Sequence, residues 1–504
     1  MPSTPSRHFP RRTAATRRRL AGGATVVMAL GLGMAPTTAH ADDAQLPTLV
    51  KTENIRSHME NLQTIAEYNG GNRASAEPGY DIAAKYVIDQ LERAGYTPEK
   101  HTYEYDNWNE NSPAVLAQTA PEERGFTLED DFVTMAYSGA GDTTAPGIAV
   151  NAETDESGCS ADDFSGFPEG AIAIVQRGTC TFTEKTQNAA DAGAAGTVIF
   201  NNEPGPLLGT VGEESAIPVV GATEEVGAEL LAAGDDLELR LSVDSEVVTK
   251  SSYSIIAESK GGAKDNVVVV GAHLDGVPDG PGVNDNGSGT AAVLETAKQF
   301  AELGAPNNKL RFAFWGTEEE GLVGSTKYVE GLSQKEIDRI ALYLNFDMIG
   351  SHNFGRFVYD GRGELDGSLP PPAGSAAIQK LFEDYFESQG LVSEPTEFSG
   401  RSDYSAFMEA GIASGGLFSG ADGVKTEEQV EYYGGTAGEQ YDPYYHTPED
   451  TIDKIDWDSV EDLSNGMAYA VEAYADSTLP VNGVLRTHQT QEFVADRLGD
   501  LWLR

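Results

Sequence analysis

Five side chains that can bind a metal ion, none of them a thiol, are spread over the second half of the chain: His273, Asp285, Glu319, Asp347 and His446. Taken singly, an acidic residue after a strand is more often a helix cap or a solvated loop residue. Taken together, imidazole and carboxylate groups are the donors of catalytic zinc sites. They suffice for two metal ions if one carboxylate bridges, and such a pair can activate water and polarise the carbonyl that it attacks.

A sixth acidic residue, Glu318, directly precedes Glu319. Two adjacent carboxylates at the end of a strand can point to different places, so that one binds metal and the other stays free as a general base. The alternative is that Glu318, Glu319 and Glu320 form the acidic start of a helix, which the helix dipole favours. We favour the general base, because His273 and Asp285 lie at the ends of neighbouring strands.

Three apolar segments must position these residues. The valine run Val267–Val270 and the segments Lys309–Trp315 and Ile340–Phe346 are typical of buried strands, and each is followed by histidine or acidic residues. An apolar-periodic helix follows Thr290. This alternation predicts an α/β fold with a mainly parallel or mixed sheet sandwiched by helices. In such sheets ligands bind at the carboxyl ends of the strands.

Five motifs resemble those of the secreted di-zinc aminopeptidases of the leucyl aminopeptidase and aminopeptidase Y type. They are GAHLDGVPDGPGVNDNGSGT, FWGTEEEGLVGS, NFDMIGS, SGRSDYSAF and YYHTPEDT, in that order. The resemblance extends over residues 45–475, with one interruption. It implies the zinc-exopeptidase fold and two Zn²⁺ ions per chain.

The resemblance also implies a role for each matching residue. His273 and His446 would bind one zinc ion, Glu319 and Asp347 would bind the other, and Asp285 would bridge them; whether Asp347 lies on the side of the second ion or of the first depends on how the loops fall. The remaining roles are Glu318 as general base, Asp275 as the carboxylate that orients the His273 ring, Tyr445 as a stabiliser of the oxyanion, Arg401 in the substrate cleft, and Met348 and Phe418 in an apolar pocket. Met348 and Phe418 equally fit ordinary core positions. One departure is YDPYYHTPED, which lacks the cysteine pair that flanks the Tyr-His motif in many relatives and leaves the rigidity of that segment open.

Residues 113–250 have a different sequence pattern, with short β-like runs and one helical segment. They contain no cluster of His, Asp and Glu at the spacing of metal ligands. The stretch GAIAIVQRGTCTFTEKTQNAADAGAAGTVIFNN resembles a protease-associated (PA) domain, which implies a non-catalytic lid or recognition module. The chain has only two cysteines, Cys159 and Cys180, both in this part. An isolated pair in an exported protein indicates a disulfide, and two free thiols are the alternative.

The first 41 residues read as a secretory signal peptide. A basic segment without acidic residues precedes an apolar run that is too short to span a membrane, and Ala39-His-Ala41 offers a cleavage site. Export by the Sec or the twin-arginine route remains open. We therefore expect a secreted protein with parts of one catalytic domain in residues 42–112 and 251–477, the PA-like insertion between them, and a C-terminal tail, 478–504, of undetermined role.

The formal net charge of −46 argues against nucleic acid or an anionic membrane as a partner.

The metal-binding motifs and the family resemblance together predict a monomeric zinc aminopeptidase that removes large apolar N-terminal residues, such as leucine, from peptides or proteins with a free N-terminus. A carboxypeptidase or dipeptidase of the glutamate carboxypeptidase type is one alternative, but it needs basic residues around the pocket. A receptor-like binding protein on the same scaffold is another, and it would lack an intact metal set.

Overall fold

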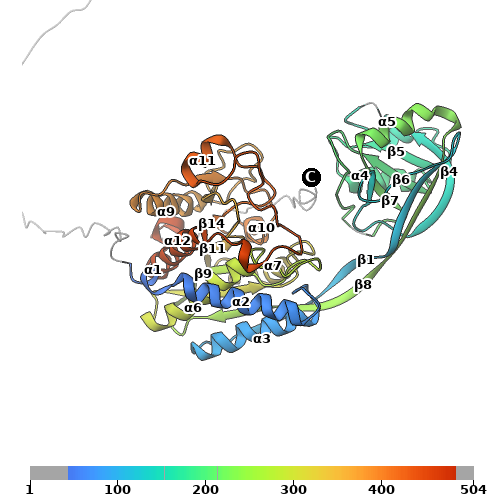
Figure 1. Cartoon of the computed structure of the whole chain (residues 1–504). Helices are drawn as coiled ribbons and strands as arrows, with labels where there is room; N and C mark the ends of the chain where they lie inside the picture. Colours follow the sequence, from blue (N-terminus) through green and yellow to red (C-terminus); the bar gives the residue numbers. More distant parts are fainter. Residues whose placement is uncertain (1–43, 153, 213, 484–504) are drawn as a thin grey trace, which may run out of the picture. The chain divides into compact units, whose positions relative to one another are not determined.

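The computed structural model describes residues 44–152, 154–212 and 214–483 (Figure 1). The predicted signal peptide and most of the predicted tail lie outside these residues. None of the described helices combines the length and apolar character that crossing a membrane requires. The described strands are hydrogen-bonded in one continuous series, in which one long strand connects two parts, a main sheet and a second sheet.

The main sheet is mixed. Its strands run in the order β13, β12, β14, β11, β9, β10, β8. The four strands β14, β11, β9 and β10 are parallel to one another, while β10 pairs with β8 and β14 pairs with β12 in antiparallel fashion. The bounds are β8 Glu238–Glu258, β9 Ala263–His273, β10 Asn308–Trp315, β11 Ile340–Phe346, β12 Phe357–Tyr359, β13 Glu394–Thr396 and β14 Ser414–Phe418. The three predicted strands are therefore confirmed as the centre of this sheet.

The alternation of side chains along β9 explains why helices cover both faces. Val268 and Val270 point into one apolar core, whereas Val267 and Val269 point into another. The first core is built mainly with α1 Leu46–Leu49, α2 Thr52–Tyr68, α3 Pro78–Arg93, α6 Gly287–Leu303, α9 Ser375–Ser388 and α12 Trp457–Asp476. The second is built with α7 Val323–Glu330 and α10 Tyr404–Glu409. The predicted helix-covered α/β sheet is confirmed.

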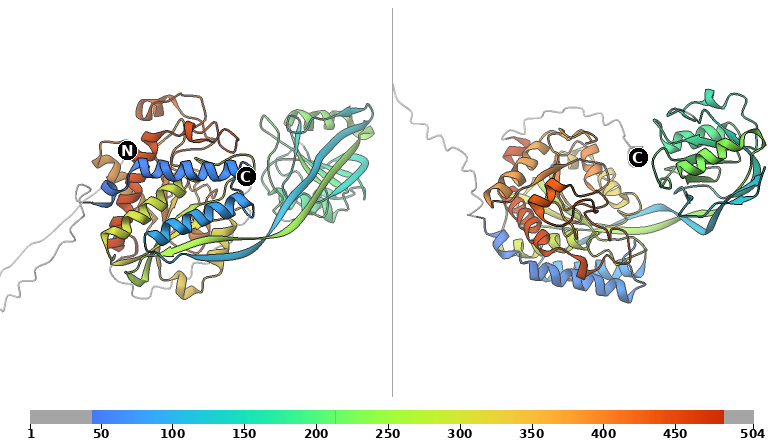
Figure 2. Two further views of the ribbon diagram at one scale, coloured as in Figure 1. Left: turned by 60° about the horizontal axis from the view of Figure 1, so that its bottom comes forward. Right: turned by 45° about the horizontal axis from the view of Figure 1, so that its top comes forward.

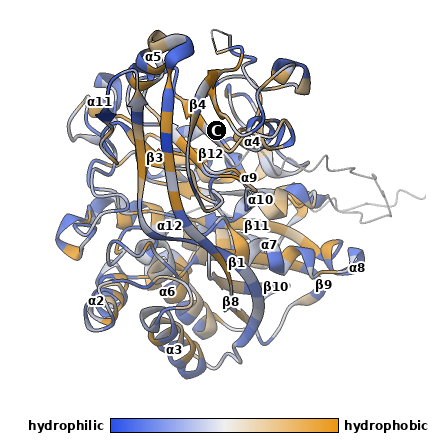
Figure 3. Cartoon of the chain, turned by 90° about the vertical axis from the view of Figure 1, so that its right-hand side faces the viewer, coloured by the Kyte–Doolittle hydropathy of each residue, from blue (hydrophilic) through white to orange (hydrophobic). Residues whose placement is uncertain are grey.

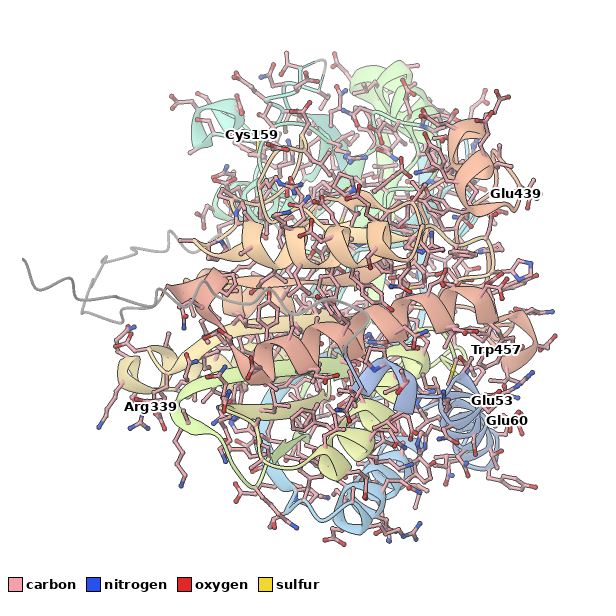
Figure 4. All side chains as sticks on the ribbon, turned by 90° about the vertical axis from the view of Figure 1, so that its left-hand side faces the viewer. Glu53, Glu60, Cys159, Arg339, Glu439 and Trp457 are labelled. Atoms are coloured by element: carbon pink, nitrogen blue, oxygen red, sulfur yellow. A yellow bond between two sulfur atoms is a disulfide. The ribbon has the colours of Figure 1, made fainter. Side chains whose placement is uncertain are left out.

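Hydrophobic colours dominate the central strands of the main sheet, whereas α2 and α3 carry hydrophilic residues on the outside (Figure 3). Glu53 and Glu60 are exposed on α2, and Trp457 begins α12 (Figure 4). The Arg56 guanidinium lies 4.5 Å from the centre of the Trp457 ring and links these two helices. Short helices complete this part of the chain: α8 Gln334–Ile337, α11 Glu427–Tyr433, η4 Ile452–Lys454 and α13 Leu479–Asn482.

A two-stranded ribbon of β1 and β8 joins the two sheets. β1, Glu99–Ala120, pairs antiparallel with β8. The paired residues extend from Glu99 opposite Ile256 to Ala120 opposite Glu238. The two strands stay side by side in every view (Figure 2). The sequence predicts only the first part of β1 as a strand, since the polar stretch 109–113 shows no apolar alternation. Both strands continue through the predicted limits of the insertion, residues 113 and 250, although the pairing shifts register between Ser112 and Val115.

The second sheet has the order β8, β4, β5, β6, β7, β3, and two apolar cores lie on its faces. Its elements are β2 Arg124–Gly125, β3 Phe132–Thr134, β4 Gly141–Ala149, η2 Ala161–Phe164, β5 Ile172–Gln176, α4 Phe182–Asp191, β6 Gly196–Phe200, β7 Val219–Ala222, α5 Glu224–Ala233 and η3 Gly234–Asp236. A disulfide joins Cys159 to Cys180, as predicted. The inserted small α/β domain is therefore confirmed.

Candidate metal centre

The predicted metal ligands converge at one edge of the main sheet. His273 is the last residue of β9, Glu319 follows β10 and Asp347 follows β11. Because these three strands are parallel neighbours, their carboxyl ends meet at this edge. Asp285 arrives on the loop between β9 and α6, and His446 arrives on the loop before η4.

The five side chains form two groups that share one residue. His273 Nε2 lies 3.1 Å from Asp285 Oδ1 and 3.1 Å from Asp347 Oδ1. His446 Nε2 lies 3.2 Å from Asp285 Oδ2 and 3.1 Å from Glu319 Oε2. Within each group the donor atoms all lie within 4.8 Å of one another, as ligands of a single ion would. Asp285 offers a different oxygen to each group.

The expected pairing of the ligands is wrong. The resemblance assigned His446 to the group of His273 and placed Glu319 with Asp347, whereas the structure groups His273 with Asp347 and His446 with Glu319. The order of the sheet gives the reason. β9 lies between β11 and β10, so Asp347 and Glu319 reach the edge from opposite sides of His273. The His446 loop approaches on the Glu319 side.

The residues of both groups fit a zinc site. Burial, and then the charge of Asp285, raises the pKa of Glu319 to about 7. Burial alone would lower the pKa of His273, but Asp347, Glu318 and Asp285 outweigh it and raise that pKa. His273 Nδ1 and Glu319 Oε1 are buried without a hydrogen-bond partner among the described residues. So many carboxylates in one buried place call for cations, and imidazole with carboxylate and without thiolate is a donor set of catalytic zinc.

Glu318 lies beside the two groups but belongs to neither. It is 8 % exposed, and burial, together with the neighbouring charges of Asp347 and Asp403, raises its pKa well above the ordinary value. The alternative of an acidic helix start is wrong, since Glu318 is on a turn and α7 begins only at Val323. A carboxylate that is free of the ligand groups, and lines the cleft in front of them, is suited to accept and return a proton.

Asp275 is fully buried behind the site. Its Oδ1 lies 3.8 Å from His273 Nδ1, which is longer than a hydrogen bond. Its Oδ2 accepts a hydrogen bond of 3.3 Å from the backbone N–H of Glu319. Asp275 therefore links the end of β9 to the Glu319 turn, and its role in orienting the His273 ring stays a prediction.

A cleft of about 330 Å³ opens in front of the ligands and contains every predicted substrate residue. Met348 and Phe418 line it together with further aromatic side chains, Phe357, Tyr359, Tyr404 and Tyr441. Tyr445 also lines it, and its ring stacks on that of His446 at 3.8 Å between centroids. Arg401 pairs with Asp422, with Nη1 3.2 Å from Oδ1.

Asn286 is a functional residue that the sequence reasoning missed. Its Oδ1 accepts hydrogen bonds from the N–H groups of Gly289, at 2.9 Å, and Met348, at 3.2 Å, while its Nδ2 donates to the carbonyl of Phe346 at 3.0 Å. Asn286 thus caps α6 and ties Asp285 to the turn that carries Asp347. A Cβ on Gly289 would lie 2.2 Å from the Phe346 carbonyl, which explains the small residues after Asn286.

The segment around His446 is held without cysteines. The Asp450 carboxylate accepts hydrogen bonds from the N–H groups of Asn284, at 2.8 Å, and Asp285, at 3.0 Å. Asp442 accepts one of 2.5 Å from Asn284 Nδ2. These two acids clamp the His446 loop to the Asp285 loop, so that hydrogen bonds take the place of the cysteine pair. The available sequence signal was the pair of acidic residues, Asp442 and Asp450, that flanks the Tyr-His motif.

Three non-glycine residues in the site have left-handed backbone conformations: Thr317, Met348 and His446, with φ of 60°, 52° and 58°. Each such residue costs on the order of 1–3 kcal/mol and persists only where the surroundings hold it. Thr317 precedes Glu318, Met348 follows Asp347, and His446 is itself a ligand. The surrounding structure therefore holds the turns that position Glu318, Asp347 and His446 in a backbone conformation that these residues do not favour by themselves.

Comparison with known proteins agrees with this geometry. Residues 254–471 match peptidase family M28 and residues 143–230 match the PA domain. An aminopeptidase of Pseudomonas aeruginosa is 46% identical over 87% of this chain and 83% of its own length. The chain belongs to peptidase family M28. The predicted family and its PA insertion are confirmed.

Other relatives of this M28 peptidase carry related names. Leucine aminopeptidase 2 of Trichophyton rubrum is 38% identical over 86% of each chain, and a probable lipoprotein aminopeptidase of Mycobacterium tuberculosis is 41% identical over 88% of this chain and 89% of its own. Among solved structures, the aminopeptidase of Aneurinibacillus sp. strain AM-1 aligns with a TM-score of 0.69 at 27% identity, covering 84% of this chain and 94% of its own. A zinc aminopeptidase of Bacillus subtilis aligns with a TM-score of 0.60 at 25% identity, over 86% and 98%.

Proposed function

We propose that this M28 peptidase is a zinc aminopeptidase that holds two Zn²⁺ ions and uses Glu318 as its general base. One observation carries the proposal: Asp285 belongs to both ligand groups through different oxygens, with Glu318 free beside them. His273 and Asp347 would bind one ion, and His446 and Glu319 the other.

When bound, zinc in such a pair supplies a Lewis acid that acidifies water and polarises a carbonyl. The protein supplies the rest. Glu318 takes a proton from the attacking water and gives it to the leaving amine. Tyr445, which lines the same cleft, donates its hydroxyl hydrogen to the oxygen that becomes negative in the transition state. Burial raises the pKa of Tyr445, so its hydroxyl keeps this proton at neutral pH.

The cleft favours a free amino terminus and a large apolar first residue. The carboxylates that line it attract the α-ammonium group, while Met348, Phe418 and their aromatic neighbours surround the first side chain. A carboxypeptidase is disfavoured, because Arg401, the one Lys or Arg among the described lining residues, is already paired with Asp422. The names of the fungal relatives support leucine as a substrate residue.

The proposal includes the predicted organisation of the chain. The enzyme is exported after removal of residues 1–41, acts as a monomer on peptides, and carries its catalytic domain in residues 42–112 and 251–477. Residues 113–250 contain the PA domain.

Glu318→Gln tests the mechanism, with Glu320→Gln as the matched control. Glu320 is an adjacent, partly buried acid outside both ligand groups. We expect Glu318→Gln to keep its zinc and lose kcat by on the order of 10²–10⁴ on leucine arylamide. Glu320→Gln should retain activity, and the wild-type enzyme should not cleave N-acetyl-leucine arylamide. A Glu318→Gln enzyme of unchanged kcat would refute the general base, and turnover of the blocked substrate would refute an aminopeptidase.

A further inference from the structure

A fully buried arginine lies under the metal centre. Arg73, in the connection between α2 and α3, is 0 % exposed. Its guanidinium donates hydrogen bonds to three backbone carbonyls, those of Leu274 at 3.2 Å, Gly282 at 2.9 Å, and Pro281. All three belong to residues 274–286, which we call the metal loop because it leads from His273 to Asp285. The five-donor fork of arginine suits such a three-point contact.

The neighbours of Arg73 make contacts of the same kind. Asn72 Nδ2 donates to the Pro278 carbonyl at 3.0 Å, again on the metal loop. The Ser75 hydroxyl contacts the hydroxyl of Thr317, the residue before Glu318. The short segment from Asn72 to Ser75 is therefore in contact with the two turns that carry Asp285 and Glu318.

The metal loop needs such support. It contains three glycines and two prolines and forms no helix or strand from Leu274 to Asn286. The carbonyls of Leu274, Pro281 and Gly282 are buried, and a buried carbonyl without a partner is destabilising by roughly 1–3 kcal/mol. Arg73 donates to all three, and Asn72 donates to a fourth carbonyl of the loop, that of the exposed Pro278.

The charge of Arg73 is also placed for the site. Its guanidinium hydrogen-bonds to backbone carbonyls and to no carboxylate of the described residues, yet it faces the charges of Asp450, Asp275, Asp285 and Glu319. Burying a cation without a direct ion pair is unfavourable. A position among buried ligands and their supporting acids offsets that cost through longer-range attraction.

We propose that Arg73 is a positioning residue for the metal centre. By fixing the metal loop it places Asp285, the one ligand common to both groups, and it therefore sets the affinity for both zinc ions rather than for one. This inference rests on the two-zinc function proposed above and assigns to it a residue from the first part of the chain, before the PA insertion.

Arg73→Lys tests the inference, because lysine keeps the positive charge but cannot reach three separate carbonyls. The readout is the affinity of the metal-free protein for its first and second zinc ion, measured by competition with a chromophoric chelator. We expect both affinities to fall by at least about 10-fold, the lower end of the effect of residues that support metal ligands. Zinc-saturated Arg73→Lys should retain wild-type secondary structure by circular dichroism.

Arg356→Lys is the matched control. Arg356 is 4 % exposed, donates to the Val392 carbonyl at 2.7 Å and pairs with Asp462, so it is a buried arginine that holds other segments together but contacts no ligand loop. Its zinc affinities should equal those of the wild type. An Arg73→Lys protein that binds both ions as tightly as the wild type overturns the inference, as does an equal loss in Arg356→Lys.

Asn72→Ala serves if Arg73→Lys does not fold. It removes the bond to Pro278 and the bond that Asn72 Oδ1 accepts from the N–H of Ala74, and a several-fold loss at both sites supports the inference while unchanged affinities overturn it. The wild-type protein separates this result from the function proposed above. If it binds two zinc ions and the Arg73→Lys protein binds them equally well, only the positioning role fails. If the wild type binds fewer than two, the two-zinc proposal itself fails.

Discussion

The substitution Ser402→Ala should weaken the binding of one zinc ion and leave the binding of the other unchanged. Ser402 Oγ donates a hydrogen bond of 2.5 Å to Asp347 Oδ2 and accepts one of 2.8 Å from Asn345 Nδ2. Both residues are buried, Ser402 at 4 % and Asn345 at 0 % exposed. Alanine removes the link that fixes the Asp347 carboxylate and takes away the acceptor of Asn345 Nδ2, while Asn345 Oδ1 keeps its bond from the Tyr343 hydroxyl.

The magnitude follows from these contacts. A stranded buried amide donor lowers the free energy of unfolding by roughly 1–3 kcal/mol. Loss of a residue that orients a metal ligand lowers metal affinity by about 10–100-fold, or about 1.4–2.7 kcal/mol. The loss should fall on the ion held by His273, Asp285 and Asp347, because the group of His446 and Glu319 does not contain Asp347.

The assay is a stepwise zinc titration of the metal-free protein, with leucine arylamide turnover followed in parallel. Ser405→Ala is the control: Ser405 is equally buried, and its hydroxyl donates only to the Gly400 carbonyl at 3.3 Å. We expect one weakened and one unchanged binding step in Ser402→Ala, and two unchanged steps in Ser405→Ala. Equal weakening of both steps, or of neither, would refute the assignment of Asp347 to a single group.

Two further predictions concern stability away from the site. Burial would raise the pKa of Glu295, but hydrogen bonds from His58, Asn54, Lys298 and Gln299 outweigh it and lower that pKa from 4.5 to about 2. The ionised carboxylate therefore adds about 3 kcal/mol to the free energy of unfolding above pH 4.5, and this contribution is lost as the pH falls towards 2. In urea unfolding, Glu295→Gln should be less stable than the wild type by this amount at pH 7, and the difference should disappear in acid. A difference that does not depend on pH would contradict this. The disulfide joins Cys159 and Cys180, which are 21 residues apart, and the double substitution Cys159→Ser and Cys180→Ser removes it. Calorimetry should show a PA domain destabilised by about 3 kcal/mol, with unchanged leucine arylamide kinetics. Lost activity on this small substrate would argue against the separation of the two apolar cores.

The sequence predicts the frame of the site because the frame follows from local patterns. Val267–Val270 is β-branched and apolar, so it forms a buried strand, and the helix after Asn286 has an apolar period. A histidine or acid at the end of each such strand must reach the same edge of a parallel sheet. The convergence of His273, Glu319 and Asp347 at one edge was therefore accessible before the structure, whereas His446 lies on a loop and was implied by the family resemblance.

The pairing of the ligands was not accessible in this way. It depends on the order of β11, β9 and β10 across the sheet and on the side from which the His446 loop approaches. Neither is encoded near His446. The ribbon of β1 and β8 was underestimated for a related reason: its polar middle is stabilised by pairing with a distant strand and carries no apolar alternation of its own.

Arg73 shows where sequence reasoning ends. Its partners are backbone carbonyls some two hundred positions along the chain, and carbonyls have no side-chain signature. The Asn345–Ser402–Asp347 link is similar, since a serine in a loop motif indicates nothing about its acceptor. Such supporting contacts become visible only when the fold brings the segments together.

In the proposed site Asp285 serves two metal ions at once. The decisive measurement is zinc analysis of the purified wild-type protein after dialysis against metal-free buffer. We expect two zinc ions per chain, both removed by a chelator together with the leucine arylamide activity and both restored with it. A fully active protein with a single zinc ion per chain would refute the shared role of Asp285.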